Sequence, residues 1–153
     1  MNMHFVSNID KELYNNMINY LGKHCDKFSL VEPHADSDGF PDKLPPTKEK
    51  LSQFLLERKR VSSWAGTQRF IFKDSEKAVE HIYKCCNISV KPLLIFDSFF
   101  DIDTEYDIDI SFYKDGKCVL FAVAHEEMLL VDLDFWGSFF VGKKCKLEST
   151  NAF

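Results

Sequence analysis

Apolar residues recur at helical spacing close to the start of the chain. Between positions 11 and 21 they fall three or four residues apart, which is the period of one buried face of an α-helix. Asn8 or Asp10 can cap the first turn, and Gly22 is a typical stop signal. We therefore expect a helix over residues 11–21.

Two more helices are expected from the same period. Leu51, Phe54 and Leu55 form an apolar stripe over residues 48–58, and the basic residues that close this segment suit a helix C-terminus. A third helix is expected over about residues 74–87. Its inward-facing residues would be Ala78, Val79, Ile82 and Tyr83.

Strand-like and loop-like segments lie between these helices. Residues 27–32 predict a strand with Phe28 and Leu30 on one face. Residues 33–47 hold four of the five prolines, together with glycine and aspartate, and predict a flexible loop. Another strand is expected at residues 67–73.

The second half of the chain has mostly strand-like patterns. Residues 107–113 alternate polar and apolar side chains, and a return strand is expected at 118–124. Asp115 and Gly116 lie between them and predict a tight hairpin turn, because both residue types accept positive φ angles. Further strands are expected at 128–133 and, as short or irregular segments, at 93–96 and 139–141, before a frayed polar tail over 143–153.

Length and composition add the fold class. The 153 residues suit one domain spanning 1–153, and no internal repeat or composition shift divides them. The 15 phenylalanines indicate an aromatic-rich core. We expect a single α+β domain, with an antiparallel or mixed sheet and about three helices packed on it.

The charge and the cysteines limit the partners and the compartment. A net charge of −5 does not favour nucleic-acid binding, and it suits either plain solubility or a basic protein partner. The chain starts without a signal-peptide pattern and has no apolar run of about 18 residues, so we expect a cytoplasmic protein that does not enter a membrane. The odd number of cysteines, without CxxC spacing, predicts reduced thiols and no zinc site: Cys25, Cys85, Cys86, Cys118 and Cys145.

A run of acidic residues is the most distinctive charge feature. It comprises Asp97, Asp101, Asp103, Glu105, Asp107 and Asp109. Crowded carboxylates repel one another, and they gain when a basic surface neutralises them. They could also bind a cation or serve a hydrolase, or form a solvated strand edge that discourages aggregation. All of these alternatives remain open at the level of the sequence.

Three shorter motifs contain residue types that could carry chemistry. Residues 34–39, HADSDG, look briefly like a calcium loop, but the EF-hand template fails at its first and twelfth positions, so no metal is expected. His125 beside Glu126 could act as a general base, but it lacks the spacing of a zinc protease and suits a structural histidine at a strand end. Trp64, in a turn without phosphate-loop spacing, is expected to anchor that turn to the core, and Gly66 of the same turn is a candidate structural or functional residue.

Three segments together resemble a group of small bacterial proteins. That group shows an S-x-W-x-G-T element, a D-L-x-F-x-x-D-G hairpin and an A-H-E segment. The corresponding letters here are SWAGT at 63–67, DISFYKDG at 109–116 and AVAHE at 122–126, and the resemblance covers residues 62–131. The group is largely uncharacterised and some members carry a sporulation-protein label. The resemblance therefore implies a small bacterial cytoplasmic protein and assigns no catalytic residue, cofactor or metal.

The function expected from the sequence is binding, without catalysis or a cofactor. By analogy with other orphan families, the chain would be an immunity protein that covers the active site of a toxin with a basic cleft. The docking residues would be Asp101, Asp103, Asp107 and Asp109, with Trp136 as an aromatic anchor. The rival hypotheses are a small hydrolase centred on His125 and nearby carboxylates, and a module that self-associates through a strand edge.

Overall fold

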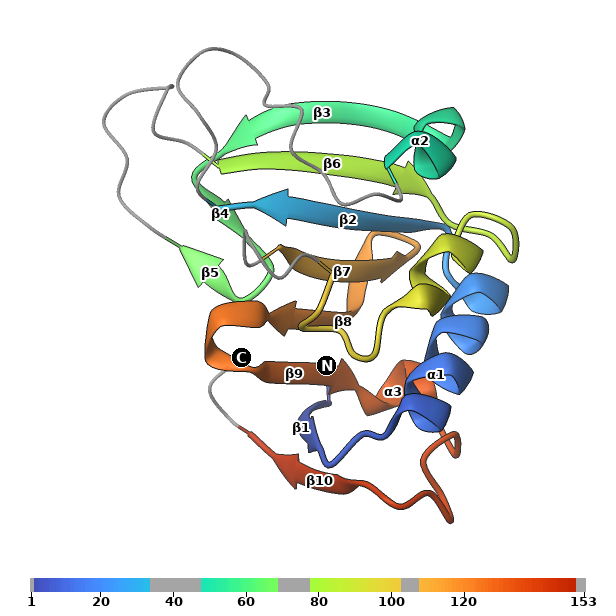
Figure 1. The fold of residues 1–153 in the computed structure, drawn as a ribbon. Coiled ribbons are helices and arrows are strands. Elements are labelled where there is room, and N and C mark those ends of the chain that lie inside the picture. The colour runs from blue at the N-terminus through green and yellow to red at the C-terminus, as the bar shows by residue number, and fades with distance from the viewer. Residues whose placement is uncertain (1, 34–47, 69–77, 103–107, 151–153) are drawn as a thin grey trace.

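The computed structural model describes residues 2–33, 48–68, 78–102 and 108–150. These residues form a single α+β domain around one antiparallel sheet of eight strands, in the order β10-β1-β9-β8-β7-β2-β6-β3 (Figure 1). The strands are β1 (Met3–Ser7), β2 (Lys27–Glu32), β3 (Leu55–Val61), β6 (Ala78–Lys84), β7 (Asp109–Lys114), β8 (Lys117–Val123), β9 (Met128–Asp132) and β10 (Lys146–Ser149).

One long helix, α1 (Lys11–His24), runs across the strands and buries one side against the sheet (Figure 1). Asp10 caps it, because its Oδ1 accepts a hydrogen bond from the backbone N–H of Leu13 at 2.8 Å. The predicted helix is confirmed, but Gly22 does not end it. A Cβ at Gly22 would lie 2.5 Å from Cγ2 of Val90, so this glycine marks a close approach inside the helix.

The other two expected helices are wrong. Of the second expected helix only α2 (Lys48–Leu51) and the 3₁₀ turn η1 (Ser52–Phe54) form, before β3 begins at Leu55. β6 takes residues 78–84 of the third expected helix, and residues 74–77 lie outside the described ranges. β6 pairs with β2 on one side and β3 on the other, and nearly all of its residues are buried. The apolar residues of β6 fall at positions 78, 79, 82 and 83, which is helical spacing, and residues on both faces of the strand are buried. Periodicity alone therefore does not separate this segment from a helix.

The β7–β8 hairpin is confirmed. Lys114 pairs with Lys117 across the turn, and Asp115 and Gly116 both have positive φ angles, +50° and +79°. The return strand and β9 also lie where the sequence places them, within one residue at each end. The strand expected at residues 107–113 is confirmed from Asp109 onward, where β7 begins, and its first four residues are all buried. Residues 103–107 lie outside the described ranges.

Both ends of the chain differ from the expectation. The tail does not fray over its described part, because β10 pairs antiparallel with β1, from His4 opposite Ser149 to Ser7 opposite Lys146. β1 itself was not predicted. All four residues of β10 are exposed, so backbone pairing and not a buried face places this strand.

Two segments in which a strand was expected form helical turns or other turns instead. Residues 93–96 belong largely to the 3₁₀ helix η3 (Lys91–Ile95), and residues 139–141 form turns after the single-turn helix α3 (Leu133–Trp136). Another 3₁₀ turn, η4 (Ala124–Glu126), joins β8 to β9. None of the helices in the described ranges is long and apolar enough to cross a membrane.

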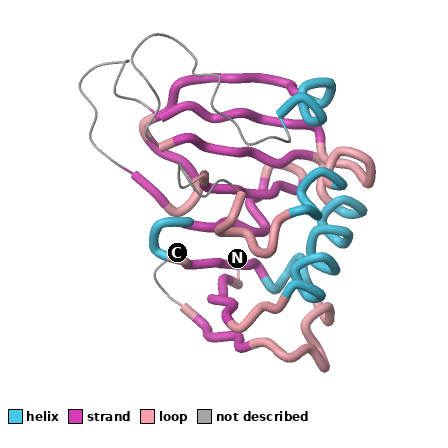
Figure 2. Tube along the Cα trace, viewed as in Figure 1, coloured by secondary structure: helices cyan, strands magenta, loops and turns pink. Residues whose placement is uncertain are grey.

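The face of the sheet opposite to α1 has an apolar half and a polar half; we call it the second face. A short hairpin of β4 (Ser63–Trp64) and β5 (Thr67–Gln68) lies toward the end of the strands opposite to the three α-helices (Figure 2). Its Ala65 packs on an apolar cluster from β1, β8 and β9, namely Met3, Phe121, Val123 and Leu130. The half of this face nearer β3 carries mainly polar side chains.

Candidate binding sites

Three separate segments of the chain meet at the carboxylate of Asp109. Asp109 is 3% exposed; its Oδ2 accepts a hydrogen bond from the indole Nε1 of Trp64 at 2.9 Å, and its Oδ1 accepts one from the backbone N–H of Ala124 at 2.8 Å. These residues belong to the SWAGT, DISFYKDG and AVAHE segments singled out in the sequence. A buried carboxylate with both oxygens engaged holds a structure together. The expected role of Asp109 in an exposed docking surface is therefore corrected.

Gly66 fixes the position of the same hairpin. Its φ is +82°, and an added Cβ would lie 2.5 Å from Cε2 of Phe121 and 3.1 Å from Cγ2 of Val123. The turn therefore needs glycine both for its backbone conformation and for its contact with β8. Trp64 anchors the turn, as predicted, and the close contact of Gly66 with β8 adds to this.

We expect Gly66→Ala to lower the free energy of unfolding by about 2–4 kcal/mol, because a positive φ and an overpacked contact both add cost. Equilibrium urea unfolding measures this. Gly142→Ala is the matched control, since Gly142 has a φ of +77° but nothing within 4 Å of an added Cβ. Equal losses in both variants would show that the contact with Phe121 does not matter.

Of the other expected docking residues, only Asp101 lies on the described surface. It is exposed, and its Oδ2 accepts a hydrogen bond from Oγ of Ser98 at 2.8 Å. Asp103 and Asp107 lie outside the described residues. Trp136 is 1% exposed and donates from Nε1 to the carbonyl of Val119 at 2.9 Å, so its expected role as a surface anchor is corrected to a core role.

His125 and Glu126 form an exposed pair on η4. The distance from Nε2 to Oε1 is 3.5 Å, with 55% and 52% of the two side chains exposed. Neither residue lines any of the three cavities described below. Among the described residues no group of three or more His, Cys, Asp or Glu side chains could hold a metal ion, and residues 34–39 lie outside that part of the chain.

A cavity of about 330 Å³ lies between the start of the chain, the segment after η3 and the β8–β9 connection. We call it the β1–η4 pocket. Its apolar walls are Val6, Ile9, Phe99, Phe100 and Leu129. Glu127 is the one ionisable residue in its described lining, and Ser98, which also lines it, is the hydrogen-bond partner of Asp101. The pocket therefore combines apolar walls with an acidic border.

Two residues of this pocket have left-handed backbone conformations. Asn8 has a φ of +61° and Glu127 a φ of +50°. Asparagine adopts this conformation at little cost, but for glutamate it is strained, and glycine is the usual residue at such a position. Strain of this kind is often kept where a side chain has a function.

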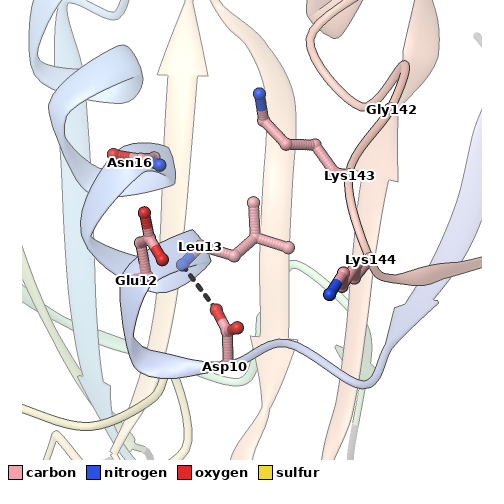
Figure 3. Close-up of a pocket in the computed structure, with 7 residues that line it drawn as sticks. All are labelled: Asp10, Glu12, Leu13, Asn16, Gly142, Lys143 and Lys144. Carbon is pink, nitrogen blue, oxygen red and sulfur yellow. Dashed lines mark hydrogen bonds between the residues drawn. The ribbon is translucent and has the colours of Figure 1, made fainter.

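A second cavity of about 300 Å³ lies beside the first turn of α1 (Figure 3). Glu12 and Asn16 line one wall, and Lys143 and Lys144 line the other. The Asp10 carboxylate at its base already caps the helix. Charges of both signs face this cleft, so it offers no single sign of charge to a partner.

A third cavity of about 420 Å³ lies on the polar half of the second sheet face. Ile82 and Tyr113 line it, with Lys27 and Lys59 facing Glu57 and Glu80 around it. A chain of hydroxyl groups lies behind: the Oγ atoms of Ser29 and Ser111 are 2.7 Å apart, and Ser111 donates to the Tyr113 hydroxyl at 3.1 Å. Burial raises the pKa of Tyr113, so its hydroxyl stays neutral.

One buried histidine–glutamate pair is not part of the lining of these cavities. Nε2 of His81 on β6 and Oε2 of Glu32 on β2 are 3.0 Å apart, with the side chains 0% and 4% exposed. No described residue offers a hydrogen-bond partner to Nδ1 of His81. This pair was not predicted from the sequence, because 49 positions separate its two residues.

Comparison with known proteins gives no assignment. No family model, curated protein or solved structure matches this chain. The resemblance of residues 62–131 to the group of small bacterial proteins stays a prediction. The residues of the β1–η4 pocket were also missed by sequence reasoning; the only signal was the polar run His125-Glu126-Glu127 between two apolar strands.

Proposed function

We propose that this chain is an immunity protein that neutralises a basic toxin by binding over its active site, and that the β1–η4 pocket marks its docking surface. The pocket carries the proposal, because it is a preformed apolar hollow whose only ionisable lining residue in the described chain is an acid. Its border continues to Asp101 through Ser98, so one exposed residue of the acidic run belongs to the same surface.

The net charge supports the same partner. A chain with a charge of −5 attracts a basic protein over long range and speeds its association. A specific interface buries roughly 800 Å² on each partner, so the contact would extend beyond the pocket. Glu126 and the first turn of α1 adjoin the lining residues Glu127 and Ile9 along the chain and would take part.

The two rival functions gain no comparable support. His125, the base of the hydrolase hypothesis, stands on an exposed turn with Glu126 as its neighbour. The described sheet has two edge strands: β3 carries four consecutive charged residues, Glu57–Arg60, and β10 carries Lys146 and Glu148. Charged edges of this kind discourage pairing with another strand.

The first test is partner identification in the native host. The tagged chain is expected to copurify with a stoichiometric protein that is toxic when expressed alone and harmless when coexpressed with this chain. Purified toxin activity should fall in proportion to the added chain up to one equivalent. A partner that is not toxic, or a toxin whose activity the chain leaves intact, would overturn the immunity proposal.

Charge reversal then tests the surface. Glu127→Lys and Asp101→Lys, made singly, are each expected to slow association by about tenfold at low salt and to flatten its salt dependence, because each removes a charge that steers the basic partner. Glu57→Lys is the matched control: it makes the same change in net charge at the opposite edge of the sheet. Stopped-flow association rates give the comparison. Equal slowing by all three variants would mean that only net charge matters.

A further inference from the structure

The walls of the β1–η4 pocket are rigid. Phe99 and Leu129 are each 1% exposed, and Val6 is 5% exposed, so three of the five apolar lining residues belong to the packed core. Phe99 also packs edge-on against Tyr14, with ring centroids 4.8 Å apart. A pocket whose walls are core side chains exists before any ligand arrives, which lowers the cost of binding.

The charged side chains described at the pocket that are free to meet a ligand are acidic. Glu127 lies in its lining, and Asp101 lies beside it through Ser98. Lys11, a cation on the neighbouring first turn of α1, donates its ammonium hydrogens to the carbonyls of Leu94 and Phe96. That lysine is therefore engaged with the backbone. An added cation would find carboxylates at the border and apolar surface inside.

Glu127 also occupies a position where glycine would make the fold more stable. Its φ of +50° at the end of η4 is the conformation in which glycine is usually found. Glutamate here costs stability and contributes a carboxylate to the pocket. A function for that carboxylate accounts for its presence.

We infer that the β1–η4 pocket is a socket for one lysine or arginine side chain of a protein partner. The aliphatic stem packs against Ile9 and Phe100, the half-buried apolar residues of the lining, and the cation pairs with the carboxylate of Glu127. Long basic side chains are suited to such a site, because they bury their methylene groups while keeping the charge at the surface. The inference rests on the proposed function, since it names the group of the toxin that the docking surface takes.

The test uses small probes with the full chain. N-acetyl-lysine methylamide and N-acetyl-arginine methylamide are titrated while backbone amide signals are followed by NMR, with N-acetyl-norleucine methylamide as the uncharged control. The lysine and arginine probes are expected to shift the amides of Val6, Phe99 and Leu129. Glu127→Gln should weaken this binding by about fivefold, as expected for loss of a charge-assisted contact, whereas Glu126→Gln should leave it unchanged. Equal binding of the norleucine probe, or no shifts at the pocket, would overturn the inference.

Glu127→Gly separates the carboxylate from a structural role. This variant is expected to raise the melting temperature by about 3 °C and to weaken the cationic probes as much as Glu127→Gln does. Full probe binding by the glycine variant would contradict the socket. The two proposals fail separately. If the chain neutralises a toxin but probe binding does not depend on Glu127, only the socket is wrong. If the probes bind as expected but the chain neutralises no toxin, only the immunity function is wrong.

Discussion

Replacing Trp136 with alanine is expected to lower the free energy of unfolding by about 3–5 kcal/mol, the range for large aromatic deletions in a packed core. Trp136 is 1% exposed. Its ring stacks on Tyr20 at a centroid distance of 4.9 Å and lies 5.0 Å from Phe139 and 5.2 Å from Phe140. Alanine would leave a cavity among these rings and an unpaired carbonyl at Val119. Urea unfolding followed by circular dichroism measures the loss.

Trp136→Phe is the graded control. It keeps much of the ring and loses the bond from Nε1, so it should cost about 1–2 kcal/mol. If Trp136→Ala instead unfolds at the same urea concentration as the parent chain and loses partner affinity, Trp136 is a surface anchor after all.

The second large effect is expected at Asp109. Asp109→Ala should lower the free energy of unfolding by about 3 kcal/mol, because it removes the acceptor of the buried backbone N–H of Ala124 and of the partly buried indole N–H of Trp64. Asp109→Asn should cost less, since the amide oxygen still accepts one of the two bonds while its NH₂ faces the other donor. The same urea experiment measures both variants.

Asp101→Ala is the matched control, because it removes an exposed aspartate of the same acidic run. It should change the free energy of unfolding by no more than about 0.5 kcal/mol, as surface substitutions usually do. If Asp109→Ala is as mild as Asp101→Ala, the three segments that meet at Asp109 do not depend on its carboxylate.

The elements that the sequence predicts correctly are those that local interactions specify. α1 contains its own apolar stripe and is capped by the adjacent Asp10. The β7–β8 turn needs positive φ angles, and Asp115 and Gly116 in the turn itself adopt them. β2 has Phe28 and Leu30 on one face and lies within the predicted bounds. Each of these signals lies within a few residues of the structure that it specifies.

The elements that were missed or wrong depend on distant partners. β6 has an apolar pattern that suits a helix, and it is a strand because β2 and β3 pair with both of its edges. β1 and β10 come from opposite ends of the chain and specify each other only when paired. In each case residues far away in the sequence supply the backbone hydrogen bonds, so a local window carries little of the signal.

The same division holds for the candidate sites. By itself, the sequence determined the acidic character of the chain, the tight turns and the three segments around Trp64, Asp109 and Ala124. Only the tertiary structure decided that Asp109 and Trp136 are interior residues and that Glu127 borders an apolar pocket with Asp101 close by. Burial is a property of what packs on a side chain, and for these residues the packing partners lie on other strands and turns.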